Sequence, residues 1–101
     1  MPSQIQFEES DGALLVTPNM PRLDAAAAVD FRRQVVPQVA GRLLVILAMQ
    51  HVEFVDSSGL GSLISVLKGL PPGGSLRLSG VREKVRSLLK MTRLDLVFSL
   101  S

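Results

Sequence analysis

The sequence has 101 residues, 47% of them hydrophobic, and no cysteine, so it predicts a single domain, residues 1–101, whose core needs no disulfide bond. The absence of cysteine also excludes thiol catalysis and cysteine-ligated metals, and it permits a reducing compartment. The formal net charge is +2, and the four phenylalanines are accompanied by no tyrosine or tryptophan, which disfavours direct nucleic-acid binding through stacked bases.

No segment predicts membrane insertion or export. The longest apolar run, residues 43–49, is far shorter than the ~20 residues that span a bilayer. The first residues, Met1 to Gln4, carry no basic side chain of the kind that opens a signal peptide. We therefore expect a cytoplasmic protein with no membrane partner.

The chain is predicted to begin with a β-hairpin. Residues 4–8 alternate, with Ile5 and Phe7 on one face, and residues 13–16 form a second apolar run after the turn signal Ser10-Asp11-Gly12. Two prolines within residues 17–21 then break regular structure, which predicts a loop.

The first helix is predicted over residues 25–36, with Asp24 as its N-cap. Ala28, Phe31 and Val35 follow at helical spacing and are expected to face the core. Pro37 is expected to kink or end this helix, because proline lacks an amide donor and its ring clashes with the preceding turn.

Residues 42–48 contain Leu-Leu-Val-Ile-Leu without alternation, which predicts a central strand covered on both faces of a sheet. Further elements are predicted as a strand over residues 75–79, a helix marked by Val81, Val85, Leu88 and Leu89, and a last short strand over residues 96–100. Strands that alternate with helices after a hairpin predict an α/β fold.

The stretch from Val52 to Leu63, Val-Glu-Phe-Val-Asp-Ser-Ser-Gly-Leu-Gly-Ser-Leu, predicts an extended segment that leads into a helix. Asp56, Ser57 and Ser58 are all N-cap residue types, and of the two serines Ser58, next to Gly59, is better placed as the cap. The helix is predicted to run to about Gly69, with an apolar stripe of Leu60, Leu63, Ile64 and Leu67 toward the core and with Ser62, Ser65 and Lys68 outside.

The start of this helix favours negative charge, because its amide groups are unpaired and the helix dipole is positive there. A phosphate group is one such charge. Gly59 and Gly61 have no side chain to shield the first turn, so a protein kinase could approach the hydroxyls of Ser57 and Ser58. An ordinary capped helix has the same pattern, and the residues alone leave both interpretations open.

Enzyme chemistry is not indicated. His51 is the only histidine and would have to serve Ser57 as a base, but Val55 and Asp56 replace the glycine that precedes the serine of a nucleophile elbow. One histidine and scattered acids give no metal-ligand cluster, and no phosphate-binding glycine loop is present.

The segment Phe54-Val55-Asp56-Ser57-Ser58-Gly59-Leu60-Gly61 resembles the signature of the STAS domain, specifically of bacterial anti-sigma factor antagonists. Leu23-Asp24 resembles the Leu-Asp pair before the family's first helix, and residues 81–98 resemble its closing helix and strand. The resemblance therefore covers nearly the whole chain. It implies a mixed β-sheet of four to five strands packed with three or more helices.

In this family an anti-sigma factor that is also a serine kinase phosphorylates the first serine of the signature, which is Ser57 here. The resemblance implies a non-enzymatic partner-switching protein without a cofactor. It would bind the kinase when unphosphorylated, leave it when Ser57 is phosphorylated, and be restored by a PP2C-like serine phosphatase. The implied partner-binding residues are Leu23, Asp24, Asp56, Ser57, Ser58, Gly59, Leu60 and Gly61.

Two positions depart from the family pattern. Ala48 stands where relatives often carry aspartate or asparagine, and Arg93 stands where glycine is usual. The alternative function is a non-switching STAS scaffold, or the soluble subunit of a stressosome or of a phospholipid ABC transporter, in which Ser57 has no switching role.

Basic residues are concentrated between Lys68 and Arg93, where Glu83 is the only acid. Such a cluster attracts acidic partners or simply forms a solvated helix face. We expect partner contact to centre on residues 56–61 and on the loop over residues 17–24, and not on the basic helix around residues 82–90.

Overall fold

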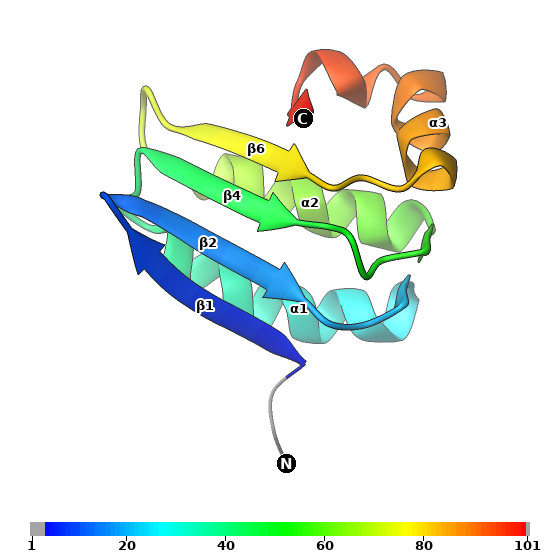
Figure 1. Cartoon of the computed structure of the whole chain (residues 1–101), viewed down its shortest axis with the longest axis horizontal. Coiled ribbons are helices and arrows are strands. Elements are labelled where there is room, and N and C mark those ends of the chain that lie inside the picture. The colour runs from blue at the N-terminus through cyan, green and yellow to red at the C-terminus, as the bar shows by residue number, and fades with distance from the viewer. Residues whose placement is uncertain (1–3, 101) are drawn as a thin grey trace.

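The computed structural model describes residues 4–100, which form one mixed β-sheet with helices packed against it (Figure 1). The sheet has strand order β1-β2-β4-β6-β7, and β1 is antiparallel to β2 while the other neighbours are parallel. Its strands are β1 Ile5–Ser10, β2 Ala13–Pro18, β4 Leu44–Ala48, β6 Ser75–Ser79 and β7 Ser99–Leu100. The helices within the described range are α1 Ala25–Val39, α2 Ser57–Lys68, α3 Glu83–Met91 and a short 3₁₀ helix, η1 Leu94–Leu96. This confirms the predicted α/β class and the predicted mixed sheet.

The predicted hairpin is present as β1 and β2. Its turn consists of Asp11 and Gly12, which have φ angles of 49° and 82°. Two successive positive φ angles are typical of the tight hairpin turn that matches the twist of the strands, and Asp-Gly is a favoured pair for it.

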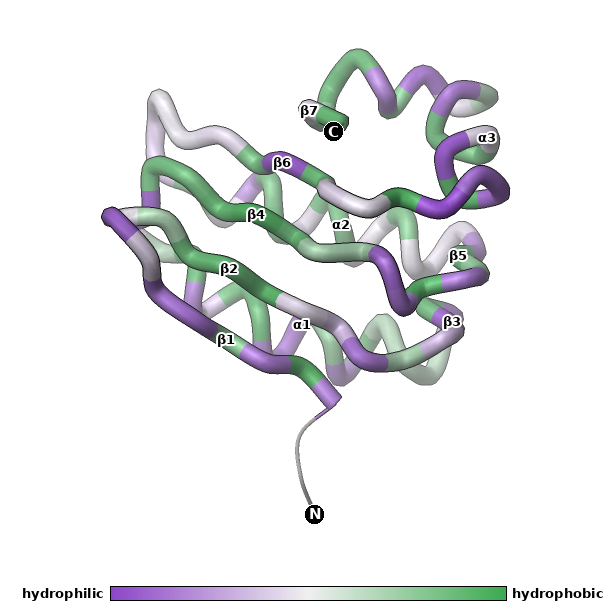
Figure 2. The backbone as a smooth tube through the Cα atoms, viewed as in Figure 1, coloured by the Kyte–Doolittle hydropathy of each residue, from purple (hydrophilic) through white to green (hydrophobic). Residues whose placement is uncertain are grey.

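The core lies between the sheet and the two helices α1 and α2. Leu14, Val45 and Leu76 are aligned across β2, β4 and β6 and are buried, as are the next aligned residues, Val16, Leu47 and Leu78. The helices contribute buried side chains that include Phe31, Val35, Val39, Leu63 and Val66. Figure 2 shows the hydrophobic colour along much of β2 and β4.

The expectation that the central strand is covered on both faces is wrong. Figure 1 shows α1 and α2 on the same side of the sheet, and Leu44 and Ile46 of β4 are half-buried on the other side. The strand order explains this arrangement. From β2 to β4 to β6 the chain moves across the sheet in one direction, so connections of the same hand place both helices on one face.

Pro37 neither ends nor interrupts α1, which continues to Val39. The proline removes one amide donor near the end of the helix, where little of the helix remains to be disturbed. Val39 is fully buried, so packing of the last turn outweighs the lost hydrogen bond. The chain then leaves the helix at Ala40 and turns at Gly41, which has a φ of 79°.

The predicted exposed side of α2 is partly wrong, because Ser62 is completely buried. Its hydroxyl donates to the carbonyl of Gly59 over 2.6 Å, which satisfies the buried polar group. Helix α2 packs on the sheet and also beside α1, so its buried surface is wider than one apolar stripe and includes Val66. Lys68 is exposed as expected.

The end of the chain is less regular than expected. The strand predicted over residues 96–100 is reduced to β7, because residues 94–96 form η1. Arg93, at the start of η1, has a φ of 60°. This left-handed conformation is unfavourable for a residue with a side chain, which accounts physically for the glycine expected at this position.

Two short strands, β3 Arg22–Leu23 and β5 Phe54–Val55, form a separate parallel pair. Helix α2 approaches this pair closely at Gly59. A Cβ atom built on Gly59 would lie 2.1 Å from the Leu23 carbonyl oxygen and 2.8 Å from Cγ1 of Val55. Glycine is therefore required here by the close contact of two backbones.

We predict that Gly59→Ala destabilises the domain by about 2–3 kcal/mol, because the carbonyl of Leu23 is backbone and has little freedom to move. Gly61→Ala is the matched control in the same helix. A Cβ at Gly61 meets nothing within 4 Å, so this change should stabilise by about 1 kcal/mol through helix propensity. Urea unfolding of both variants measures the difference, and equal effects would contradict the close-contact explanation.

Candidate functional site

Two structurally equivalent segments meet beyond the carboxyl ends of β2 and β4. In each, a short strand is followed by an aspartate and then by a helix. Leu23 pairs with Val55 across β3 and β5, Asp24 precedes α1, and Asp56 precedes α2. The two aspartates have nearly the same backbone, with φ and ψ of −104° and −171° for Asp24 and of −101° and −172° for Asp56. The N-termini of α1 and α2 therefore lie side by side, and the loop before α1 borders the signature serines.

Asp56 connects these two N-termini. Its Oδ1 accepts a hydrogen bond from the amide of Gly59 over 2.9 Å, in the first turn of α2. Its Oδ2 accepts from the amide of Ala25 over 3.2 Å, at the first residue of α1. A single carboxylate thus satisfies one exposed donor on each helix. The expectation that Ser58 is the cap is wrong, because the pairing of β3 with β5 brings Asp56 into that position.

Asp24 is the predicted cap of α1, and its Oδ1 accepts from the amide of Ala27 over 3.2 Å. This hydrogen bond lowers the pKa of Asp24, and the guanidinium of Arg22, 3.5 Å from Oδ2, lowers the pKa further. The guanidinium of Arg22 also lies 4.3 Å from the ring centroid of Phe54. Arg22 therefore links the exposed surfaces of β3 and β5.

Ser57 and Ser58 are exposed at the first two positions of α2. Within residues 4–100 neither hydroxyl has a hydrogen-bond partner, because the capping role belongs to Asp56. Their amide groups have no partner inside the helix by position. The arrangement therefore presents two unused hydroxyls and two amide donors to solvent, next to one carboxylate.

The predicted partner-binding residues fall into two groups. One group, Leu23, Gly59 and Leu60, is buried. These residues pack inside the domain and offer no side chain to a partner. The reason predicted for Gly59, open access to the helix, is replaced by close packing. The remaining residues are accessible, namely Asp24, Asp56, Ser57, Ser58 and Gly61. Contact of a partner with these residues stays a prediction.

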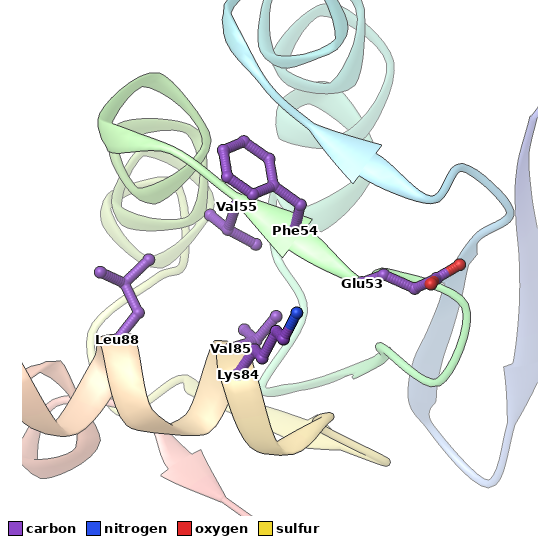
Figure 3. A pocket seen from close by; sticks show the side chains of 6 residues that line it. All are labelled: Glu53, Phe54, Val55, Lys84, Val85 and Leu88. Atoms are coloured by element: carbon purple, nitrogen blue, oxygen red, sulfur yellow. The ribbon is translucent and has the colours of Figure 1, made fainter.

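An apolar groove of about 210 Å³ lies between α3 and β5, the strand that ends two residues before Ser57 (Figure 3). It is lined by Glu53, Phe54, Val55, Lys84, Val85 and Leu88. Figure 3 shows that Val55 extends from β5 toward Val85 and Leu88 on the helix. Sequence reasoning missed this groove, because the approach of α3 to β5 joins residues about thirty positions apart and no local pattern signals it.

His51 is exposed in the turn before β5 and forms no hydrogen bond with Ser57 in the described part of the chain. Residues 4–100 contain no group of three histidine, cysteine, aspartate or glutamate side chains that could hold a metal ion. None of the helices in this range is long and apolar enough to cross a membrane.

Comparison with known proteins gives a consistent family match. Residues 4–101 match the model of the STAS domain. A candidate anti-sigma factor antagonist from Thermotoga maritima is 26% identical, with a TM-score of 0.83, and the match covers 95% of this chain and 84% of that chain. SpoIIAA from Bacillus in its phosphorylated form is 19% identical, with a TM-score of 0.68 and coverage of 96% and 90%. A sulfate transporter family protein from Wolinella succinogenes is 22% identical, with a TM-score of 0.73 and coverage of 89% and 74%. The last two likenesses show a shared fold.

We predict that Asp56→Ala destabilises the domain by about 2 kcal/mol, because it leaves amide donors on two helices without their acceptor. Asp56→Asn should cost about half as much, since its amide retains one acceptor oxygen and loses the other. Ser58→Ala should change the free energy of unfolding by less than about 0.5 kcal/mol. Chemical denaturation of the three variants measures this order, and a larger loss for Ser58→Ala than for Asp56→Ala would contradict the assignment of the cap.

Proposed function

Because this chain belongs to the STAS domain family, we propose that it acts in the cytoplasm as an anti-sigma factor antagonist that is switched by phosphorylation of Ser57. In its unphosphorylated form it binds an anti-sigma factor with serine kinase activity, and phosphorylation ends that binding. A PP2C-like serine phosphatase restores the binding form. The protein itself is a binding partner and not an enzyme.

The observation that carries this proposal is the exposed, unused hydroxyl of Ser57 at the start of α2. A residue that capped the helix could not be modified without loss of the cap, but here Asp56 supplies the cap. The family resemblance selects Ser57 over Ser58. Two similar proteins support the proposal: one is a candidate anti-sigma factor antagonist, and SpoIIAA occurs in a phosphorylated form.

The switch would work through local charge. Transfer of a phosphoryl group from ATP to Oγ of Ser57 adds roughly 1.5–2 negative charges. The free amides of Ser57 and Ser58 can donate hydrogen bonds to the phosphate oxygens, so the helix can stay folded. The carboxylate of Asp56 also lies at the start of α2, however, and its hydrogen bonds to the amides of Ala25 and Gly59 hold it there. A partner surface suited to the Asp56 carboxylate alone would then meet both this carboxylate and the phosphate on Ser57. Removing two neighbouring negative groups from water is costly, so binding weakens.

We predict that the cognate kinase and ATP add one phosphate to the wild-type protein and to Ser58→Ala, but none to Ser57→Ala. Intact mass and peptide mapping measure the addition. Ser57→Asp should remain folded and bind the kinase about a hundredfold more weakly, a loss of roughly 3 kcal/mol.

Phosphate on Ser58 would refute the choice of acceptor. Tight kinase binding by a folded Ser57→Asp variant would instead favour the non-switching scaffold or transporter subunit.

A further prediction concerns where the kinase docks. Gly61 lies one turn after Ser57, and a side chain there meets open space, so Gly61→Arg should block docking with little change in stability. The matched control reverses charge on α3 through Arg86→Glu and Lys90→Glu. Arg82 is left unchanged, since its Nε donates to the carbonyl of Gln50 over 2.8 Å. Calorimetry should show binding lost for the first variant and retained for the control, and the reverse result would place docking on the basic helix.

A further inference from the structure

Within residues 4–100, no helix covers the face of the sheet opposite α1 and α2 (Figure 1). Leu15 of β2 and Leu44 and Ile46 of β4 point to this side and are half-buried. One charged residue borders them on each neighbouring strand, Glu8 on β1 and Arg77 on β6, both exposed. We call these five residues the open face. It has the composition of a small interface, with an apolar centre and a polar rim.

The registers of the strands align four residues of the open face in one row. Glu8 pairs with Leu15, Leu15 with Ile46, and Ile46 with Arg77. Since neighbouring strands lie about 4.8 Å apart, Glu8 and Arg77 are separated by roughly 14 Å, which is too far for an ion pair in one chain. Neither takes part in an ion pair with any residue of the range 4–100.

We propose that the open face binds the open face of a second copy of this chain, through a two-fold axis that runs parallel to the strands between β2 and β4. This axis exchanges the two halves of the row. Glu8 of each copy then faces Arg77 of the other, and Leu15 of each copy faces Ile46 of the other. The row is thus complementary to itself, as a two-fold interface requires.

The charges select this axis over the other simple arrangement. A two-fold axis along the row, perpendicular to the strands, would bring Glu8 onto Glu8 and Arg77 onto Arg77, and like charges repel. Two sheets that pack face to face lie about 10 Å apart, and leucine and isoleucine side chains fill such a space well. A second copy therefore meets both the apolar centre and the charged rim.

The candidate functional site stays accessible in this dimer. Ser57 begins α2, and α2 lies on the covered side of the sheet (Figure 1). A dimer would present two such sites on opposite outer surfaces. The proposal does not depend on the proposed function, because it uses none of the residues of that site.

Sedimentation equilibrium of the full chain, at protein concentrations up to about 1 mM, tests the dimer. The wild type should associate to a dimer, and added salt should weaken it because the rim pairs are screened. Glu8→Arg and Arg77→Glu should each weaken dimerisation at least about a hundredfold, since each places like charges opposite one another twice.

Combining the two charge reversals should restore the association that each of them weakens. A mixture of Glu8→Arg with Arg77→Glu should form a heterodimer, because one chain is then basic at both positions and the other is acidic at both. The double variant carrying both changes should dimerise with itself again. Arg32→Glu and Glu53→Arg, exposed and outside the open face, are the matched controls and should leave the wild-type dimer intact.

Three results would overturn the proposal. These are a wild-type protein that stays monomeric over the whole concentration range, single variants that dimerise as well as the controls, and a mixture of folded single variants that does not associate. Circular dichroism and thermal unfolding of each variant establish that it is folded before its association is compared.

Discussion

The carboxylate of Asp56 is the contact on which the functional end of this molecule depends. It accepts one amide from each of two helices, and these helices belong to different connections of the sheet. Its backbone is extended because Val55 is paired in β5, and this places both oxygens between the helix ends. Without this acceptor, amides on both helices would lack a protein partner, and the close approach of α2 to Leu23 would lose its anchor.

A division of roles at the start of α2 follows from this contact. Aspartate performs the capping that serine or threonine performs in many helices, so the hydroxyls of Ser57 and Ser58 are left for other chemistry. Serines at a capped N-terminus are also held in a fixed position by the helix, which makes them a defined target for another protein. The neighbouring Arg22 and Phe54 form a contact of their own on the same surface. A partner that reached Ser57 would therefore meet charged, aromatic and apolar groups within a small area.

The topology separates two surfaces with different properties. Because the chain crosses the sheet in one direction from β2 to β6, α1 and α2 lie on one face with their N-termini at one edge, while within residues 4–100 no helix covers the other face. The edge displays the hydroxyls of Ser57 and Ser58, which can be modified, and amide groups that can bind a negative charge. The open face displays aliphatic side chains between the acidic Glu8 and the basic Arg77, which suits packing against a complementary surface. The common handedness of the two strand–helix–strand connections thus produces both the edge with the helix N-termini and the open face.

Much of the fold was evident from the sequence because its signals are local. The Asp11-Gly12 turn, the cap at Asp24, the helical spacing of Phe31 and Val35, and the strand at residues 75–79 each depend on neighbours within one or two turns of chain, and the structure confirms them. The position of the candidate serines at a helix start was determined in the same way.

Tertiary contacts decided the rest. Three adjacent residues are all of N-cap type and the sequence favoured Ser58, but the pairing of β5 with β3 selected Asp56. Packing between α1, α2 and the sheet buried Ser62 and made glycine necessary at position 59, neither of which helical periodicity can signal. An apolar strand has the same composition whether one face or both are covered, so the open face became visible only when the helices had been placed. Local chemistry determines what each segment forms, while long-range packing determines which side chains remain accessible.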